Sequence, residues 1–371
     1  MATQVTNYQC PACTGPLHYS GSTGRLECDY CGSSFDPAEI EKMYAEKESE
    51  AAKAQAKAEE KTDTGTWEEA SGGDWGADAE KMRAYTCPSC GAEIVCDETT
   101  AATSCPYCGN PTIIPGQFSG KRKPEYILPF KLSREDAVKA LENHYKGKVF
   151  LPKAFRSKKH IEEVRGIYVP FWLFDGEAEG AANYMATTTR VFRHGDTEIT
   201  ETSFYELQRE GTLPFKNVPV DASTKMPDDH MDSIEPFDYS ELKPFSTSYL
   251  PGFLADKFDV SIEQSKGRAD ERCRKSLSDA LRDTTRSARI YSTVTTASEH
   301  ISLKRSSAHY ALLPVWLLNT KWNGKDYLFA MNGQTGRLVG DLPVDRKQFW
   351  LLFAKIAVPM TAVLTVLLHL M

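Results

Sequence analysis

The stretch Cys87–Asn110, CPSCGAEIVCDETTAATSCPYCGN, contains two CxxC pairs that are separated by fourteen residues. An earlier stretch repeats this arrangement, because Cys10 and Cys13 are followed by fourteen residues and then by Cys28 and Cys31. Each CxxC turn supplies two thiolates to a tetrahedral metal, and fourteen residues are enough for two short strands. The doubled spacing therefore predicts two small β zinc ribbons.

The predicted metal ligands are all the cysteines of these two clusters. Four thiolates fill the tetrahedral shell of zinc, so we expect two structural zinc ions per chain, neither with a position open for activating water. A redox dithiol is the alternative for a lone CxxC pair, but four cysteines per cluster without a thioredoxin-like pattern argue against it. The expected ligands are Cys10, Cys13, Cys28 and Cys31 for one ion, and Cys87, Cys90, Cys105 and Cys108 for the other.

Two further residues lie inside the predicted ribbons. Cys96 stands between the pairs of the second cluster, where it is either a spare ligand or a buried strand thiol, and the apolar sequence around it favours the thiol. His18 lies within the first ribbon. Because four cysteines already complete that site, we expect His18 at the surface of the hairpin.

The composition sets limits on the class of protein. The chain has 371 residues, which is room for two or three domains, and a net charge of −7, which argues against non-specific coating of nucleic acid. The first ten residues, MATQVTNYQC, contain no basic and apolar leader, so no secretory signal is visible. We therefore expect the cysteine-rich part to remain in the cytoplasm with reduced thiols.

A linker is expected between the two ribbons, over residues 37–82. Its first part is rich in Ala, Glu and Lys, which favour a helix, and residues 61–80 are acidic and glycine-rich, which favours disorder. Trp67 and Trp75 stand out in this segment. They are either a docking motif or caps on a neighbouring surface, and the sequence does not decide between the two.

The largest predicted domain is of the α+β class and spans residues 124–345. Ser133 followed by Asp136 indicates a helix start, and an apolar stripe through residues 269–288 indicates a second helix. The segments YVPFWLFDGEAEG, with Pro170 and Trp172, and LLPVWLLNTKWNG, with Pro314 and Trp316, each follow a predicted helix, which predicts a possible internal duplication. The flanking domains are ribbon one over 1–36 and ribbon two over 83–115.

The C-terminal residues 349–371 are mostly apolar. A helix of this length spans roughly 34 Å, which exceeds the hydrocarbon core of about 30 Å. Arg346 and Lys347 precede it and favour the cytoplasmic side for the preceding domain. We expect a single-pass transmembrane helix with the bulk of the chain in the cytoplasm, the alternative being a buried amphipathic helix.

The combination of segments resembles a known family. The two CxxC clusters, CPSCGAEIV with SCPYCGN, the segments LPFK and YVPFWLFD, and LLPVWLL followed by GKDYLFAMNGQTGRLVGDLP are similar to bacterial TFIIB-type zinc-ribbon-containing membrane proteins. Members are often found beside phage-shock-protein-A-like proteins of envelope stress. The resemblance implies an accessory or anchoring role, with a phage-shock-protein-A-like protein as the possible partner and no catalytic residues.

The leading hypothesis is thus a membrane-anchored cytoplasmic adaptor for protein–protein interaction, and the alternative is a nucleic-acid-binding or transcription-related protein. Each ribbon carries more acidic than basic residues, which argues against phosphate binding, although the basic run Lys121–Lys123 lies nearby. No zincin, Walker or nucleophile-elbow motif is present, so we expect no enzyme. Asp228, Asp229 and His230 are either a hydrophilic metal site or, more simply, a polar loop.

Overall fold

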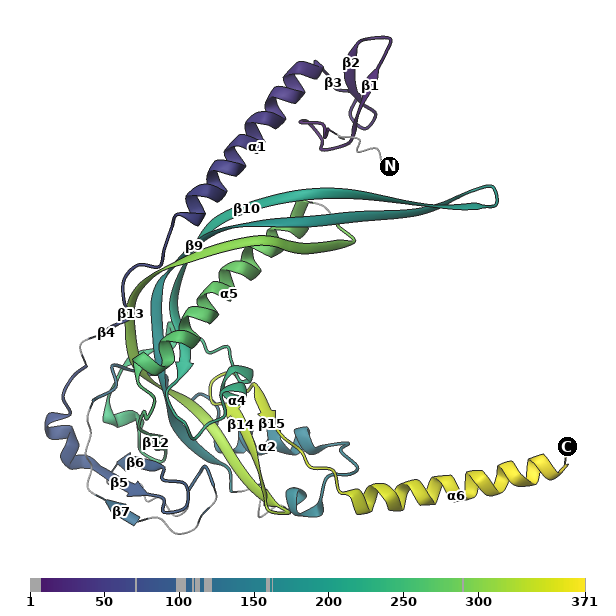
Figure 1. Ribbon diagram of the computed structural model, residues 1–371. Coiled ribbons are helices and arrows are strands. Elements are labelled where there is room, and N and C mark those ends of the chain that lie inside the picture. Colours follow the sequence, from purple (N-terminus) through teal and green to yellow (C-terminus); the bar gives the residue numbers. More distant parts are fainter. Residues whose placement is uncertain are drawn as a thin grey trace. The chain divides into compact units, whose positions relative to one another are not determined.

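The computed structural model describes residues 8–70, 72–97, 105–108, 110, 114–116, 122–157, 161, 163–288 and 290–370. Residues 98–104 of the second predicted ribbon, Lys121 of the basic run and Met371 of the predicted span lie outside this range. The chain forms two compact units (Figure 1). Unit 1 comprises residues up to Thr64, Glu177–Pro214 and Arg274–Lys304, and unit 2 comprises Gly65–Gly176, Phe215–Cys273 and the residues from Arg305 onward.

Unit 1 begins with a small antiparallel sheet in the order β1–β2–β3. Its strands are β1 (Leu17–Ser20), β2 (Arg25–Cys28) and β3 (Ser34–Phe35), and the helix α1 (Pro37–Glu59) follows directly. Asp36 caps α1 by accepting from the Ala38 amide at 2.9 Å, and Pro37 occupies the first helical position, where its missing donor is harmless. This is the helix predicted for the first part of the linker.

The large sheet has twelve strands over the described residues, most of them in the order β11-β8-β13-β9-β12-β6-β5-β7. In addition β10 pairs with β9, β4 and β14 with β13, and β15 with β14. The strands are β4 (Glu68–Glu69), β5 (Met82–Thr86), β6 (Glu93–Asp97), β7 (Ile114–Gly116), β8 (Tyr126–Ile127), β9 (Arg165–His194), β10 (Thr197–Asp221), β11 (Lys243–Pro244), β12 (Leu254–Asp256), β13 (Thr293–Trp322), β14 (Lys325–Asn332) and β15 (Leu338–Gly340).

The helices accompany this sheet. They are α2 (Arg134–Tyr145), α4 (Asp228–Ser233), α5 (Ile262–Ala288) and α6 (Arg346–Leu370), with short 3₁₀ turns at η1 (Gly76–Lys81), η2 (Lys153–Arg156), η3 (Tyr239–Glu241) and η4 (Thr247–Tyr249). The body is therefore a mixed α/β structure, which agrees with the predicted class at the level of a helix-and-sheet domain.

The second cysteine cluster is part of the main sheet. Strands β5 and β6 form its hairpin, and β6 pairs antiparallel with β12, where Val95 lies opposite Ala255. The same Ala255 pairs in parallel register with Tyr168 of β9. The sequence predicts a separate small domain over residues 83–115, whereas in the structure these strands extend the sheet of unit 2.

The helices α2 and α5 begin in the same way. Ser133 and Asp136 exchange hydrogen bonds at 3.0 and 3.2 Å, which confirms the predicted helix start. Ser261 and Gln264 form the same reciprocal cap on α5, at 2.9 and 3.4 Å. Such a capping box satisfies two backbone amides that the helix itself leaves without partners.

The two Pro-Trp segments make matching contacts with these helix starts. The indole of Trp172 donates to the carbonyl of Val260, two residues before α5, at 2.8 Å. The indole of Trp316 donates to the carbonyl of Leu132, two residues before α2, at 3.2 Å. These contacts are those expected of a duplicated helix-plus-sheet unit, and duplication itself stays a prediction.

The linker tryptophans are buried in unit 2. Trp67 donates to Asp270 at 2.9 Å and packs edge-on against Phe174, and Trp75 packs edge-on against Phe245. The described residues of 61–80, expected to be disordered, therefore lie against the body of unit 2 from Gly65 onward. Burial of two indoles compensates for the polar composition on which that expectation rests.

Helix α6 is the candidate membrane segment. Among the described residues one helix is long and apolar enough to cross a membrane, over Arg346–Thr365, and none of it is buried. The 25 residues of α6 span about 37 Å. Trp350, Leu351 and Val358 are each more than 60% exposed, so the alternative of a helix buried in the body is not observed.

Candidate metal centres

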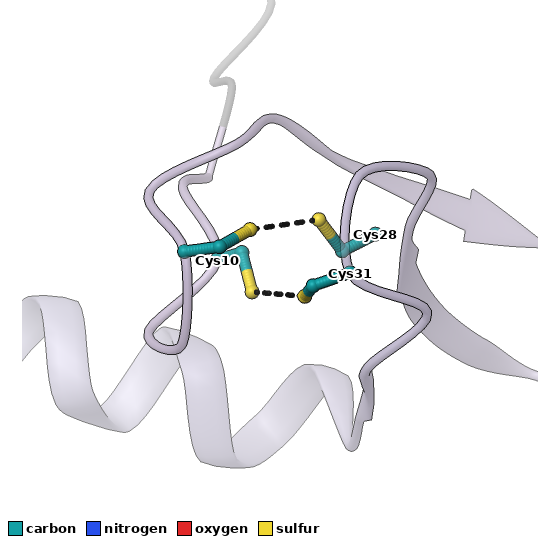
Figure 2. Close-up of side chains that lie close together, drawn as sticks. Cys10, Cys28 and Cys31 are labelled. Carbon is teal, nitrogen blue, oxygen red and sulfur yellow. Dashed lines mark hydrogen bonds between the residues drawn. The ribbon is translucent and has the colours of Figure 1, made fainter.

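The first cysteine site, Cys10, Cys13, Cys28 and Cys31, gathers four sulfur atoms that lie within 4.8 Å of one another. The sulfurs of Cys10 and Cys31 are 3.6 Å apart, and those of Cys13 and Cys28 are 3.4 Å apart (Figure 2). Around zinc, with bonds of about 2.3 Å, tetrahedral sulfurs stand about 3.8 Å apart. The spacing fits a four-coordinate metal ion.

The second cysteine site, Cys87, Cys90, Cys105 and Cys108, has the same geometry. The sulfurs of Cys87 and Cys108 are 3.6 Å apart, as are those of Cys90 and Cys105. Cys87 and Cys105 are fully buried and belong to the main hydrophobic core of unit 2, beside Ile94. The second site therefore forms part of the core of unit 2, and the small core around the first site lies in unit 1.

All four cysteine turns share one backbone fold. In each, the amide of the first cysteine donates to the carbonyl five residues later, at 2.7 to 3.0 Å; the pairs are Cys10 with Gly15, Cys28 with Ser33, Cys87 with Ala92, and Cys105 with Asn110. In the three turns where the residue four positions after that cysteine is described, this residue has a positive φ, 71° at Gly32 and 72° at Gly91, where glycine is favoured. In the first turn this position is Thr14, with φ of 61°. The first turn therefore keeps the positive φ although it lacks the glycine.

Local donors favour the thiolate form at two ligands. Hydrogen bonds from the hydroxyl and amide of Ser33 lower the pKa of Cys31 to about 6. Burial acts to raise the pKa of Cys87, but hydrogen bonds from the amides of Cys90 and Ser89 and from the thiols of Cys108 and Cys90 together lower this pKa to about 7. Because metals bind the thiolate, these donors favour metal binding near neutral pH.

Cys96 and His18 stand apart from the two sites. Cys96 is fully buried in β6 among apolar core residues and is not among the clustered ligands, which agrees with a strand thiol. His18 is about half exposed and lies 3.4 Å from Asp29, at the surface of the first hairpin as expected.

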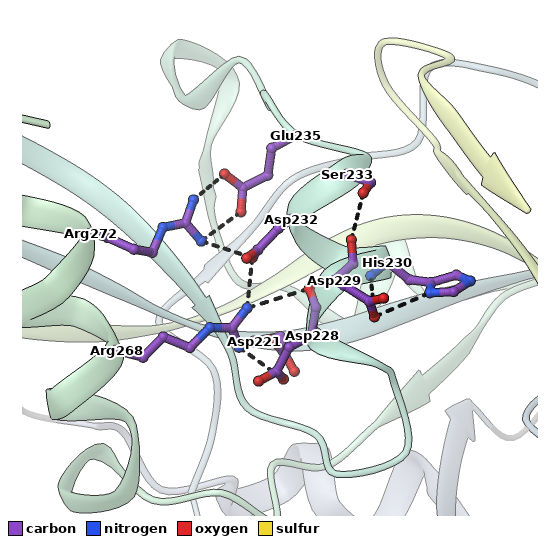
Figure 3. A network of polar contacts seen from close by, with 9 residues as sticks. All are labelled: Asp221, Asp228, Asp229, His230, Asp232, Ser233, Glu235, Arg268 and Arg272. Carbon is purple, nitrogen blue, oxygen red and sulfur yellow. Dashed lines mark hydrogen bonds and ion pairs between the residues drawn. The ribbon is translucent and has the colours of Figure 1, made fainter. Parts of the chain in front are cut away.

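The acidic run around His230 is an ion-pair network (Figure 3). Arg268 contacts the carboxylates of Asp221, Asp228 and Asp232 at 2.6 to 2.9 Å, and Arg272 pairs with Glu235 and Asp232. Within the described residues, the two cysteine sites are the groups that could hold a metal ion. This segment is the short helix α4, which forms ion pairs with Arg268 and Arg272 of α5. It is therefore neither the polar loop nor the hydrophilic metal site considered from the sequence.

The basic run at Lys121–Lys123 is neutralised where the structure describes it. Arg122 pairs with Glu69, and with Glu125 at 2.7 Å. Lys123 pairs with Asp78 at 2.8 Å. These two side chains are therefore already engaged with carboxylates and are poorly placed to neutralise phosphate groups.

Elemental analysis of the purified chain should give two zinc ions per molecule, because both sites present four sulfurs at the spacing of a tetrahedral metal. Cys96→Ser should leave the content at two, since Cys96 lies outside both sulfur clusters. Loss of one ion in this variant would make Cys96 a ligand, and a content near one in the wild type would remove one of the two sites.

Two four-cysteine centres, a mixed α/β body with a large sheet and one exposed apolar helix define a metal-binding protein with a candidate membrane segment. The chain is 32% identical over 322 residues to "Uncharacterized protein YdjG" of Bacillus subtilis (strain 168), and the match covers 74% of this chain and 94% of that protein. The chain belongs to the same family as YdjG. No protein-family model matches it, and no solved structure matches it.

Proposed function

We propose that this protein is a membrane-anchored cytoplasmic adaptor that presents zinc-stabilised surfaces to protein partners. One observation carries the proposal: two all-cysteine sites with complete tetrahedral ligand sets share a chain with an exposed apolar helix. All-thiolate sites stabilise structure and leave no position for chemistry on the metal. The exposed helix supplies attachment to the bilayer, with Arg346 and Lys347 on the cytoplasmic side.

The partner class follows from the family resemblance drawn from the sequence. Proteins with this set of segments accompany phage-shock-protein-A-like proteins, so we propose a partner of that kind in a membrane-stress system. The first cysteine site supports a role in contact, because Tyr19 of β1 and Tyr30 of the Cys28–Cys31 turn are each more than 60% exposed. Aromatic side chains of this kind are enriched in the centres of protein interfaces.

We propose no catalytic role. Ser307, His309 and Glu125 are hydrogen-bonded in series at 3.1 and 2.7 Å, an order that resembles a nucleophile, a base and an orienting acid. However, Glu125 also accepts from Arg122 at 2.7 Å and from the Tyr310 amide at 3.3 Å, which ties it to the structure. None of the three residues lines the cavity of about 450 Å³ that unit 2 contains.

Affinity capture from membranes in detergent tests the adaptor role. The intact chain should retain a phage-shock-protein-A-like protein, and Cys28→Ser should reduce retention at least about tenfold by unfolding the first site. Cys96→Ser is the matched control and should retain the partner fully. Equal retention by Cys28→Ser would remove the first site from the interface.

The same preparation separates the adaptor from the alternative nucleic-acid binder. The intact chain should bind DNA or RNA no more tightly than about 10⁻⁴ M at physiological salt. Binding at micromolar concentrations that weakens steeply with salt would overturn the adaptor proposal in favour of phosphate recognition.

A further inference from the structure

Unit 2 contains a cavity of about 450 Å³ that the adaptor proposal does not use. This volume lies within the range of small-molecule sites in proteins, about 300 to 1,000 Å³. Four aromatic side chains line it, together with aliphatic groups such as Leu250 and Leu312; the aromatic residues are Trp75, Phe245, Phe258 and Tyr310. All of the lining belongs to unit 2.

The basic side chains in the lining already have acidic partners. Lys257 pairs with Glu93 at 2.9 Å, and Lys225 lies 3.9 Å from Asp259. Arg122 pairs with Glu69 and Glu125, which stand outside the lining. None of these three cations is left to attract an anionic ligand.

One acid in the lining, Asp256, lacks such a counter-charge. Its carboxylate accepts from the hydroxyl of Ser223 at 2.7 Å and from the backbone amide of Lys257 at 3.0 Å, and the residue is only 5% exposed. Among the described residues no basic side chain forms an ion pair with it. Burial raises the pKa of Asp256 to about 7, because a buried carboxylate without a cationic partner is costly to ionise.

The aromatic rings complete an environment suited to a cation. Phe258 and Tyr310 pack edge to face with ring centroids 5.2 Å apart, and both line the cavity beside Asp256. Aromatic faces attract cations through the ring quadrupole, and desolvated sites show the larger effects. The N-terminal end of α5 opposes this with its partial positive charge, but Ser261 and Gln264 already accept from its first amides.

We infer that this cavity binds a small organic cation, a quaternary or protonated amine, with the charge beside Asp256 and the carbon groups against the aromatic wall. The cation would supply the counter-charge that Asp256 lacks, and the aromatic rings would shield part of the pair from water. The same chemistry is offered by free choline and by the phosphocholine headgroup of a lipid. The lining contains no metal ligand and no residue of α6, although Gly91, Glu93 and Val95 of the second cysteine hairpin contribute to it.

Calorimetric titration of the full chain in a maltoside detergent tests this inference. Choline should bind saturably and at least about tenfold more tightly than its neutral isostere 3,3-dimethylbutan-1-ol, because only choline carries the charge. Asp256→Asn should weaken choline binding at least about tenfold and leave the affinity for the isostere unchanged. Asp326→Asn, the same substitution at a half-exposed acid of unit 2 outside the lining, should alter choline affinity less than about threefold.

The zinc content and the tryptophan spectrum would reveal whether Asp256→Asn fails to fold. A second variant tests the inference in that case. Phe258→Leu keeps an apolar wall and removes a ring face, so it should weaken choline selectively. Tighter binding of glycerophosphocholine than of choline assigns the site to a lipid headgroup, and the reverse assigns it to a free amine. Equal affinity for choline and its isostere, or no saturable choline binding up to about 10 mM, overturns the inference.

Discussion

Cys105→Ser should unfold unit 2, whereas Cys28→Ser should leave the melting of unit 2 unchanged. Cys105 is 1% exposed in the same core as Ile94 and Leu254, and its hairpin strand β6 is hydrogen-bonded to β12. Losing the metal there removes a contribution on the order of 10 kcal/mol, which is comparable with the whole stability of a domain. The first site has its own small core of Leu17, Leu26 and Ile40 in unit 1.

The measurement is a thermal unfolding curve followed by tryptophan fluorescence. All six tryptophans of the chain belong to unit 2, so this signal reports on that unit alone. Both variants should contain one zinc ion, which shows that each has lost a single site. Identical melting of the two variants would contradict the structure, because it would make the second site as peripheral to unit 2 as the first.

Ending the chain after Lys347 should move the protein from the membrane fraction to the soluble fraction. The shortened chain loses nearly all of α6, the one helix among the described residues that is long and apolar enough to span a bilayer. The exposed side chains of α6 include Leu351, Val358 and Leu364, each at least 60% exposed. Transfer of each apolar side chain from water into the bilayer lowers the free energy.

Membrane sedimentation after a high-salt wash checks this expectation. Val358→Arg in the full chain should reduce membrane retention, since Val358 lies at the midpoint of α6 and a charge near the helix centre costs about 3 kcal/mol, and the matched Val358→Ala should not. If the shortened chain still sediments with membranes, another attachment exists and α6 is not the anchor.

Local chemistry made parts of this structure predictable. The ligand clusters follow from CxxC spacing because a tetrahedral metal dictates where four sulfurs stand, and the cap at Ser133 depends on residues three apart. The apolar stripe of α5 is buried as predicted at Ala269, Cys273 and Leu277. Near the end of the stripe Thr285 is buried and Thr284 is exposed, so the buried positions keep a spacing of four residues. In a helix of 3.6 residues per turn this spacing shifts the buried face slowly around the helix.

Long-range pairing could not be predicted in this way. The strand register that joins Val95 to Ala255 depends on two segments with no common local signal, so the second site was expected to be a separate domain. The cavity at Asp256 has the same origin, since Trp75, Phe258 and Tyr310 come together only in the folded sheet. Disorder was expected around Trp67 because composition does not show which surface two indoles will cover.

The pairing of the linker with β13, a strand much later in the sequence, has a consequence for synthesis on the ribosome. Thr64 pairs with Lys304, and the backbone amide of Leu303 donates to Asp63 at 3.0 Å. At about 5 to 20 residues per second, the intervening residues take about 12 to 48 s to translate. During that interval the nascent linker has no β13 strand to pair with, and Trp67 stays exposed. The acidic, glycine-rich composition around Trp67 disfavours its association with other apolar segments in the meantime.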